Sequence, residues 1–202
     1  MIYTTLRRIK AHEPEASGWN KLLRQLRREK EDDTPVPIAT ILVLCGFKDA
    51  LFCLRAEPQH NNIWRMLAVH YARQVQHLMK SEKAIKCLDI AWDYADGKAT
   101  WDQLGFASFT ANAEVGVYDW ADRSALAAAS VCGDKYYTEQ YEATTMVSRA
   151  ASFAEGAKAR HAGGPAEGAA GAASRHLTLV EQARDLLTVL THYNAQPGEH
   201  TT

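Results

Sequence analysis

The feature that most constrains the fold is the stretch Ile38–Leu104, in which apolar residues recur at helical spacing between recognisable helix starts and stops. Apolar side chains three and four positions apart fall on one face of a helix. Ser81 ahead of Glu82 is typical of a helix start, and Thr100–Gln103 has the T-x-x-Q pattern of a capping box. We therefore expect short helices here, packed as antiparallel hairpins.

The most regular segment is Ile63–Met79, where apolar and polar residues fall on opposite arcs of a helical wheel. The polar arc contains Arg65, His70, Arg73, Gln74, Gln76 and His77. Two faces this distinct predict one continuous helix, packed on one side and exposed to water on the other.

The residues outside Ile38–Leu104 are also predicted to be helical. Leu6 and Ile9 predict a short amphipathic helix over residues 3–10. Residues 107–162 are rich in alanine, which has the highest helix propensity, and predict two longer helices broken near Gly133. The five glycines of 156–174 predict either a flexible connector or a poorly defined helix end. A final helix is expected over 176–193, with an inner stripe of Leu179, Ala183, Leu186 and Leu190.

The fold class that follows is all-α: a bundle of short stacked helix hairpins with longer Ala-rich C-terminal helices. We expect two parts. Residues 1–104 form a helical domain, and residues 105–202 form an Ala-rich helical extension that packs on it and includes the connector.

Composition narrows the function classes. The 202 residues carry a formal net charge of −1, which argues against direct nucleic-acid binding and against a strongly acidic mimic of DNA. The N-terminus has no signal-peptide pattern, and the longest apolar run, Ile38–Cys45, is far too short to span a membrane. Four widely spaced cysteines predict buried, reduced thiols. We expect a soluble cytoplasmic protein with no membrane contact.

The standard motifs of catalysis and cofactor binding are absent. The chain has no phosphate-binding G-x-x-x-x-G-K-[ST], no G-x-G-x-x-G after a strand, no H-E-x-x-H and no G-x-S-x-G. We therefore predict no catalytic residue, no metal ligand and no cofactor.

The best candidate site is the polar stripe His70, Arg73, Gln74 and His77, which a continuous helix would present on one face. Its two histidines are seven positions apart, or about 10 Å along a helix axis, too far for both to bind one zinc ion. The stripe is either a solvent-exposed polar face or a surface for protein contact.

Two further groups of residues are candidates. Asp89, Asp93 and Asp96 share a helix face near Asp102, and paired carboxylates can hold a cation or transfer protons, although the polar face of an amphipathic helix looks the same. Aromatic residues in the second half are either core or an exposed binding patch. As candidate protein-binding residues we select four of them, Trp120, Tyr136, Tyr137 and Tyr141.

Three segments of the first half resemble a family of small helical proteins from phage and bacterial genomes. They are ATILVLCGFKDALFCLRA (39–56), AVHYARQVQHLM (68–79) and CLDIAWDYADGKAT (87–100). In that family an immunity-protein-like helical domain precedes Ala/Trp-rich helices. The resemblance covers roughly residues 1–104. The second half departs from it, because Gly, Tyr and Thr interrupt the regular Ala/Trp/Arg repeats.

The resemblance implies a non-enzymatic binding protein, phage-encoded, that neutralises a bacterial host protein or defence complex such as CRISPR–Cas. It brings no catalytic residues. Two alternatives stay open. The Ala-rich helices could pair between subunits, giving a homodimer or a self-assembling structural protein. A metal-dependent helical enzyme would instead use the histidine or the aspartate stripe.

Overall fold

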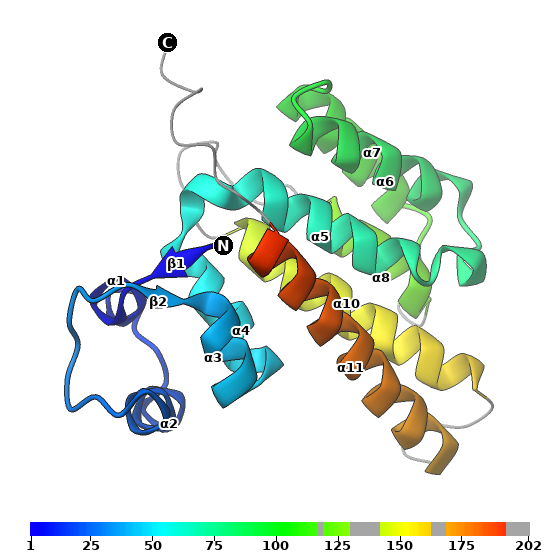
Figure 1. The fold of residues 1–202 in the computed structure, drawn as a ribbon. Coiled ribbons are helices and arrows are strands. Elements are labelled where there is room, and N and C mark those ends of the chain that lie inside the picture. Colours follow the sequence, from blue (N-terminus) through cyan, green and yellow to red (C-terminus); the bar gives the residue numbers. More distant parts are fainter. Residues whose placement is uncertain (117–118, 130–141, 163–168, 193–202) are drawn as a thin grey trace. The chain divides into compact units, whose positions relative to one another are not determined.

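In the computed structural model, described for residues 1–116, 119–129, 142–162 and 169–192, helices dominate and one small pair of strands accompanies them (Figure 1). The prediction of an all-α bundle is confirmed. None of the described helices has both the length and the apolar character needed to cross a membrane. The chain divides into two compact units, one of residues 1–57 with the stretch from Ala183 onward, the other of residues 58–182. The domain boundary expected after residue 104 falls inside the second unit and stays a prediction.

The first unit opens with a short strand rather than a helix. Strand β1, Tyr3–Thr4, pairs antiparallel with β2, Val36–Pro37. Helix α1 occupies only Leu6–Lys10, because the extended Thr5 caps it by accepting a hydrogen bond from the N–H of Arg8 at 3.2 Å. The predicted helix over residues 3–10 is therefore wrong at its first residues.

The remaining helices of this unit are short, and most of their buried residues are aliphatic, with Trp19 as an aromatic exception. They are α2 (Ala16–Leu26), α3 (Ile38–Cys45), α4 (Phe47–Cys53) and the 3₁₀ turn η1 (Leu54–Ala56). Gly46 separates α3 from α4 with φ +93°, a backbone angle that side chains disfavour. The end of the last helix closes the unit: Leu186 and Leu190 are fully buried, and the N–H of Ile2 donates to the carbonyl of Leu190.

The second unit is built around helix α10 (Glu142–His161). Its elements are η2 (Pro58–His60), α5 (Asn61–Arg73), η3 (Gln76–Leu78), α6 (Glu82–Ala95), α7 (Trp101–Asn112), α8 (Trp120–Ala128), α10 and the first part of α11 (Ala169–His192). Helix α10 packs against both α5 and α8. Helix α6 packs against α5, α7 and α8, and α7 lies beside α6 at the edge of the unit (Figure 1).

The alanines of α10 explain how this helix packs closely against both α5 and α8. Five of them are buried: Ala150, Ala151, Ala154, Ala157 and Ala159. Small side chains let helix backbones approach closely, and Ser124 of α8 donates a buried hydrogen bond to the carbonyl of Ala150 at 2.8 Å. The small faces of α8 and α10 are thus used inside the chain.

Both helix starts marked by capping residues are confirmed. The Ser81 hydroxyl accepts from the N–H of Ala84 at the start of α6. At α7 the capping box is complete, with Gln103 N–H donating to the Thr100 hydroxyl at 3.2 Å and Thr100 N–H donating to the Gln103 amide oxygen at 2.7 Å.

The expected helix over 63–79 is shorter than predicted. Helix α5 ends at Arg73, and the chain then tightens into i→i+3 turns, with Val75 N–H bonded to the carbonyl of Ala72. This turn places Val75 in a buried cluster with residues of α8 and α10. Arg65 was predicted on the solvent-exposed face of this helix but is only 5% exposed. Its guanidinium lies over the ring of Tyr94 and donates to the carbonyl of Ala128.

Two expectations for the C-terminal helices also change. Helix α10 continues to His161 and α11 begins at Ala169, so most of the stretch predicted as a connector is helical. The buried side of α11 in this unit contains Thr178 and Gln182, whereas Leu179 is exposed. Gln182 is held inside because its amide donates to the carbonyl of Ala151 at 3.0 Å.

Candidate protein-binding surface

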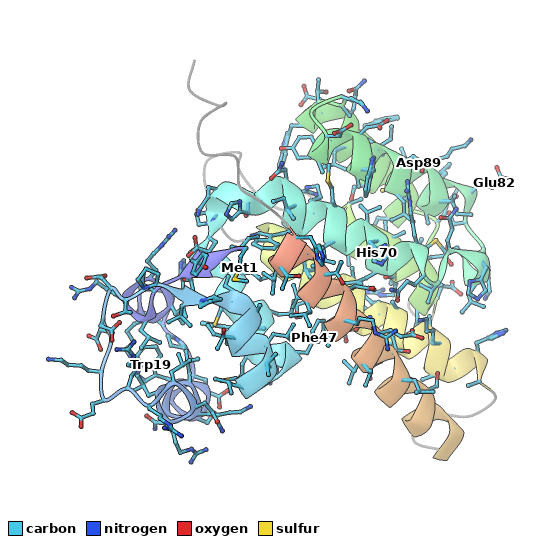
Figure 2. All side chains as sticks on the ribbon, viewed as in Figure 1. Met1, Trp19, Phe47, His70, Glu82 and Asp89 are labelled. Atoms are coloured by element: carbon cyan, nitrogen blue, oxygen red, sulfur yellow. The ribbon has the colours of Figure 1, made fainter. Side chains whose placement is uncertain are left out.

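The four residues of the polar stripe do not share one helix face, because α5 ends within the stripe. His70 and Arg73 lie in the last turn of α5, and Gln74 follows it with its amide 3.5 Å from the His70 ring. Figure 2 shows His70 on α5. His77 belongs to the separate turn η3, where its ring centroid lies 6.4 Å from that of His161.

Three members of the stripe contact neighbouring helices of the same unit. Arg73 forms an ion pair with Asp89 of α6 at 2.9 Å and lies over the ring of Trp92. Gln74 accepts a hydrogen bond from Lys158 of α10, and His77 lies against His161 of the same helix. These contacts tie the end of α5 and η3 to α6 and α10, so a large part of the stripe has a structural role. The role of these four residues in binding stays a prediction.

Trp120 is half buried at the start of α8, against α10. Its ring makes an edge contact with Phe153 at 5.7 Å, and the guanidinium of Arg160 lies 5.2 Å from its centroid. Its indole N–H is buried without a hydrogen-bond partner among the described residues. Its place in the interface between α8 and α10 accounts for a tryptophan here. Tyr136, Tyr137 and Tyr141 lie outside the described residues.

A cavity of about 250 Å³ adjoins Trp120, and its lining includes Lys80, Asp119 and Asp122. Lys80 donates to Asp119 at 2.9 Å, and this hydrogen bond lowers the pKa of Asp119 and raises the pKa of Lys80. The buried Asp122 carboxylate accepts from the backbone N–H groups of Lys80 and Ser81. This network joins the segment before α6 to the start of α8, so we assign it a structural role.

The aspartate stripe does not form a metal centre in the described structure. Asp89 is paired with Arg73, and Asp96 is paired with Lys98. Figure 2 shows Asp89 on α6. Within the described ranges, no group of three or more His, Cys, Asp or Glu side chains has an arrangement that could hold a metal ion.

The strongest surface feature is one that the sequence pattern did not reveal, a pair of exposed phenylalanines on α7. Phe106 is 72% exposed and Phe109 is 75% exposed, while Leu104 and Ala111 bury the opposite face. Residues three apart lie next to each other on a helix. One signal was present in the sequence: no charged residue occurs between Asp102 and Glu114, so the apolar residues of this helix are not confined to one face.

Exposed pairs of this kind are informative. Single exposed apolar residues are normal on a protein surface, but contiguous large apolar side chains mark sites of interaction. Aromatic residues also concentrate binding energy at interfaces. The outer face of α7, defined by Phe106 and Phe109, is therefore the candidate protein-binding surface. Comparison of the chain with protein-family models, curated proteins and solved structures finds no match.

Proposed function

We propose that this protein acts by binding another protein and is a non-enzymatic inhibitor that blocks a bacterial protein complex in the host cytoplasm. A phage-encoded anti-defence factor, such as an anti-CRISPR, or an immunity-like protein is the form implied by the family that residues 1–104 resemble. The observation that carries the binding role is the exposure of Phe106 and Phe109 on α7.

Energetics support a binding role for this pair. Burying a phenylalanine side chain stabilises an association by about 1.5–3 kcal/mol relative to leaving it in water. Neither Phe106 nor Phe109 makes that gain within the chain, since both are more than two thirds exposed. The pair therefore contributes little to folding and has most of its apolar area available to a partner.

The buried alanines favour a partner of a different kind over assembly through the Ala-rich helices. Self-assembly through α10 would need its small-residue face at the surface. Ala150, Ala154 and Ala157 are instead buried inside the second unit. The outer face of α7 is thus the better candidate for contact with another molecule.

The test is affinity capture from a bacterial host that carries active defence systems, comparing the wild-type protein with Phe106→Ser/Phe109→Ser. Surface substitutions of this kind change the free energy of unfolding by only about 0.5 kcal/mol, so the variant is expected to fold. Leu177→Ser/Val180→Ser is the matched control, since it removes two exposed apolar side chains from α11. Thermal unfolding of all three proteins verifies that they are folded.

We expect a stoichiometric protein partner with the wild type and with the α11 control, and its loss with the α7 variant. The wild type should also protect an infecting phage or plasmid from the captured defence system, whereas the α7 variant should not. A partner captured equally by both double variants would contradict the assignment of the surface. A wild-type protein that captures no partner would contradict the proposed function itself.

A further inference from the structure

Acidic charge is concentrated in the hairpin of α6 and α7. Residues 82–114 carry six acidic and three basic side chains, a net charge of −3, while the whole chain carries −1. The rest of the chain is therefore slightly basic. The acidic residues are Glu82, Asp89, Asp93, Asp96, Asp102 and Glu114, and the basic ones are Lys83, Lys86 and Lys98.

The structure gathers part of this charge at one end of the hairpin. Helices α6 and α7 run antiparallel, as contacts at both ends show. Lys83 near the start of α6 pairs with Glu114 just after α7, and Tyr94 near the end of α6 is in ring contact with Trp101 at the start of α7. Asp93 in the last turn of α6 and Asp102 in the first turn of α7 consequently belong to the same end of the hairpin.

Helix stability does not account for all of these carboxylates. Negative charge near a helix C-terminus is unfavourable, because the backbone dipoles place partial negative charge there. Asp93 lies in the last turn of α6, Asp96 is its C-terminal cap, and that turn contains no basic residue. Lys98 compensates Asp96 in part through an ion pair. An external role for the acidic end is consistent with this arrangement.

The acidic end continues directly into the exposed aromatic pair. Asp102 and Phe106 are four residues apart on α7, so they are neighbours on its surface, and Phe109 is the next residue along the same face. All three side chains are exposed. The outer face of α7 thus presents a carboxylate beside two apolar anchors.

We infer that the occupant of this face is a basic protein surface, with an apolar pocket for Phe106 and Phe109 and with Lys or Arg side chains that meet the acidic end of the hairpin. The inference rests on the proposed function and specifies the chemistry of the partner. A second copy of this chain that docks through the same face is a poor occupant, because it would bring another hairpin of net charge −3 against the first.

The test uses the full chain and two synthetic helical peptides as probes. Both peptides have the same leucine face, but the polar positions are lysine in one and glutamate in the other. Binding is measured by fluorescence anisotropy at low and high salt. The variants are Phe106→Ser/Phe109→Ser and Asp93→Asn/Asp102→Asn. Glu29→Gln/Glu31→Gln is the control for charge, since it neutralises two exposed carboxylates of the first unit.

We expect saturable binding of the lysine peptide, about tenfold or more tighter than that of the glutamate peptide. Raising the salt from about 50 to about 500 mM should weaken it, because exposed charges are screened. The phenylalanine variant should lose binding, the aspartate variant should weaken it several-fold, and the glutamate control should match the wild type.

Equal affinity for the two peptides, binding to neither, or binding that the phenylalanine variant retains would each overturn the inference. So would a wild-type homodimer in sedimentation that the phenylalanine variant abolishes, because a second copy would then be the occupant. The proposed function is tested separately, by capture from lysate, and fails if the wild type captures no partner. If capture depends on Phe106 and Phe109 but not on salt or on the aspartates, the binding role stands and the basic partner does not.

Discussion

Gly156 of α10 lies directly against the indole ring of Trp120. A Cβ at position 156 would fall 2.5 Å from Cε3 and 2.9 Å from Cζ3 of that ring, closer than real side chains approach. The ring cannot easily retreat, because Phe153 and Arg160 contact it. A glycine in mid-helix, which costs helix stability, is explained here by the approach of α8 to α10.

Gly156→Ala should therefore destabilise the protein, whereas the same change at Gly105 should stabilise it. Overpacking costs about 1–3 kcal/mol, against a gain of about 1 kcal/mol in helix propensity. At Gly105 in α7 a Cβ would meet no atom within 4 Å, so only the propensity gain of about 1 kcal/mol applies there. Chemical denaturation measures both. Equal shifts of the same sign would contradict the packing described for Trp120.

Thr100→Ala should lower the free energy of unfolding by about 1 kcal/mol, because it removes one half of the capping box at α7. Thr100→Ser retains the hydroxyl that accepts from Gln103 N–H and should stay close to the wild type. Denaturant midpoints of the two variants provide the comparison. If the serine variant loses as much stability as the alanine variant, the cap is not the source of the effect.

Acid should destabilise the first unit through His12. Burial, and then the positive charges of Arg55 and Arg8, lower the pKa of His12 below its usual 6.5. Below pH 6.5 the unfolded chain binds this proton more readily than the folded one, so stability falls as the pH drops. His12→Gln should flatten the dependence of the free energy of unfolding on pH between about 7 and about 5. Denaturation at several pH values measures the slope, and an unchanged slope would contradict this role.

The thiols of Cys45, Cys53 and Cys87 should resist alkylation and disulfide reagents in the folded protein. All three are buried and free, and burial raises the pKa of each, to about 12 for Cys87. In a Cys132→Ser variant, reaction with a chromogenic disulfide at about pH 8 should be slow until denaturant is added. An immediate reaction of any of the three would show that the core opens there.

Features that depend on a few neighbouring residues were predictable from the sequence. The caps at Ser81 and Thr100 follow from contacts three residues apart, and both were placed at the correct residue. The helical class followed from the same local periodicity. The candidate surface on α7 was not predictable from the sequence. Phe106 and Phe109 lie at ordinary helical spacing, and only the packing of α7 on α6 decides which side of the helix is exposed.

Features that depend on distant partners were not predictable. Arg65 is buried because Tyr94 and the carbonyl of Ala128 receive its guanidinium, and neither is near it in the sequence. Gln182 is buried for the same reason, since its amide reaches the carbonyl of Ala151 and its own backbone carbonyl accepts from the Tyr71 hydroxyl at 2.8 Å. From the sequence alone, a polar residue on a helix is predicted to be exposed unless its hydrogen-bond partner is known.

The bond from Ile2 to the carbonyl of Leu190 has a consequence for synthesis on the ribosome. The first unit combines residues 1–57 with residues close to the end of the chain, including the buried Leu186 and Leu190. The second unit is continuous in sequence. We therefore expect residues 58–182 to fold before the first unit is complete, although residues 1–57 are made first. During that interval the aliphatic side chains of the first unit remain accessible to chaperones.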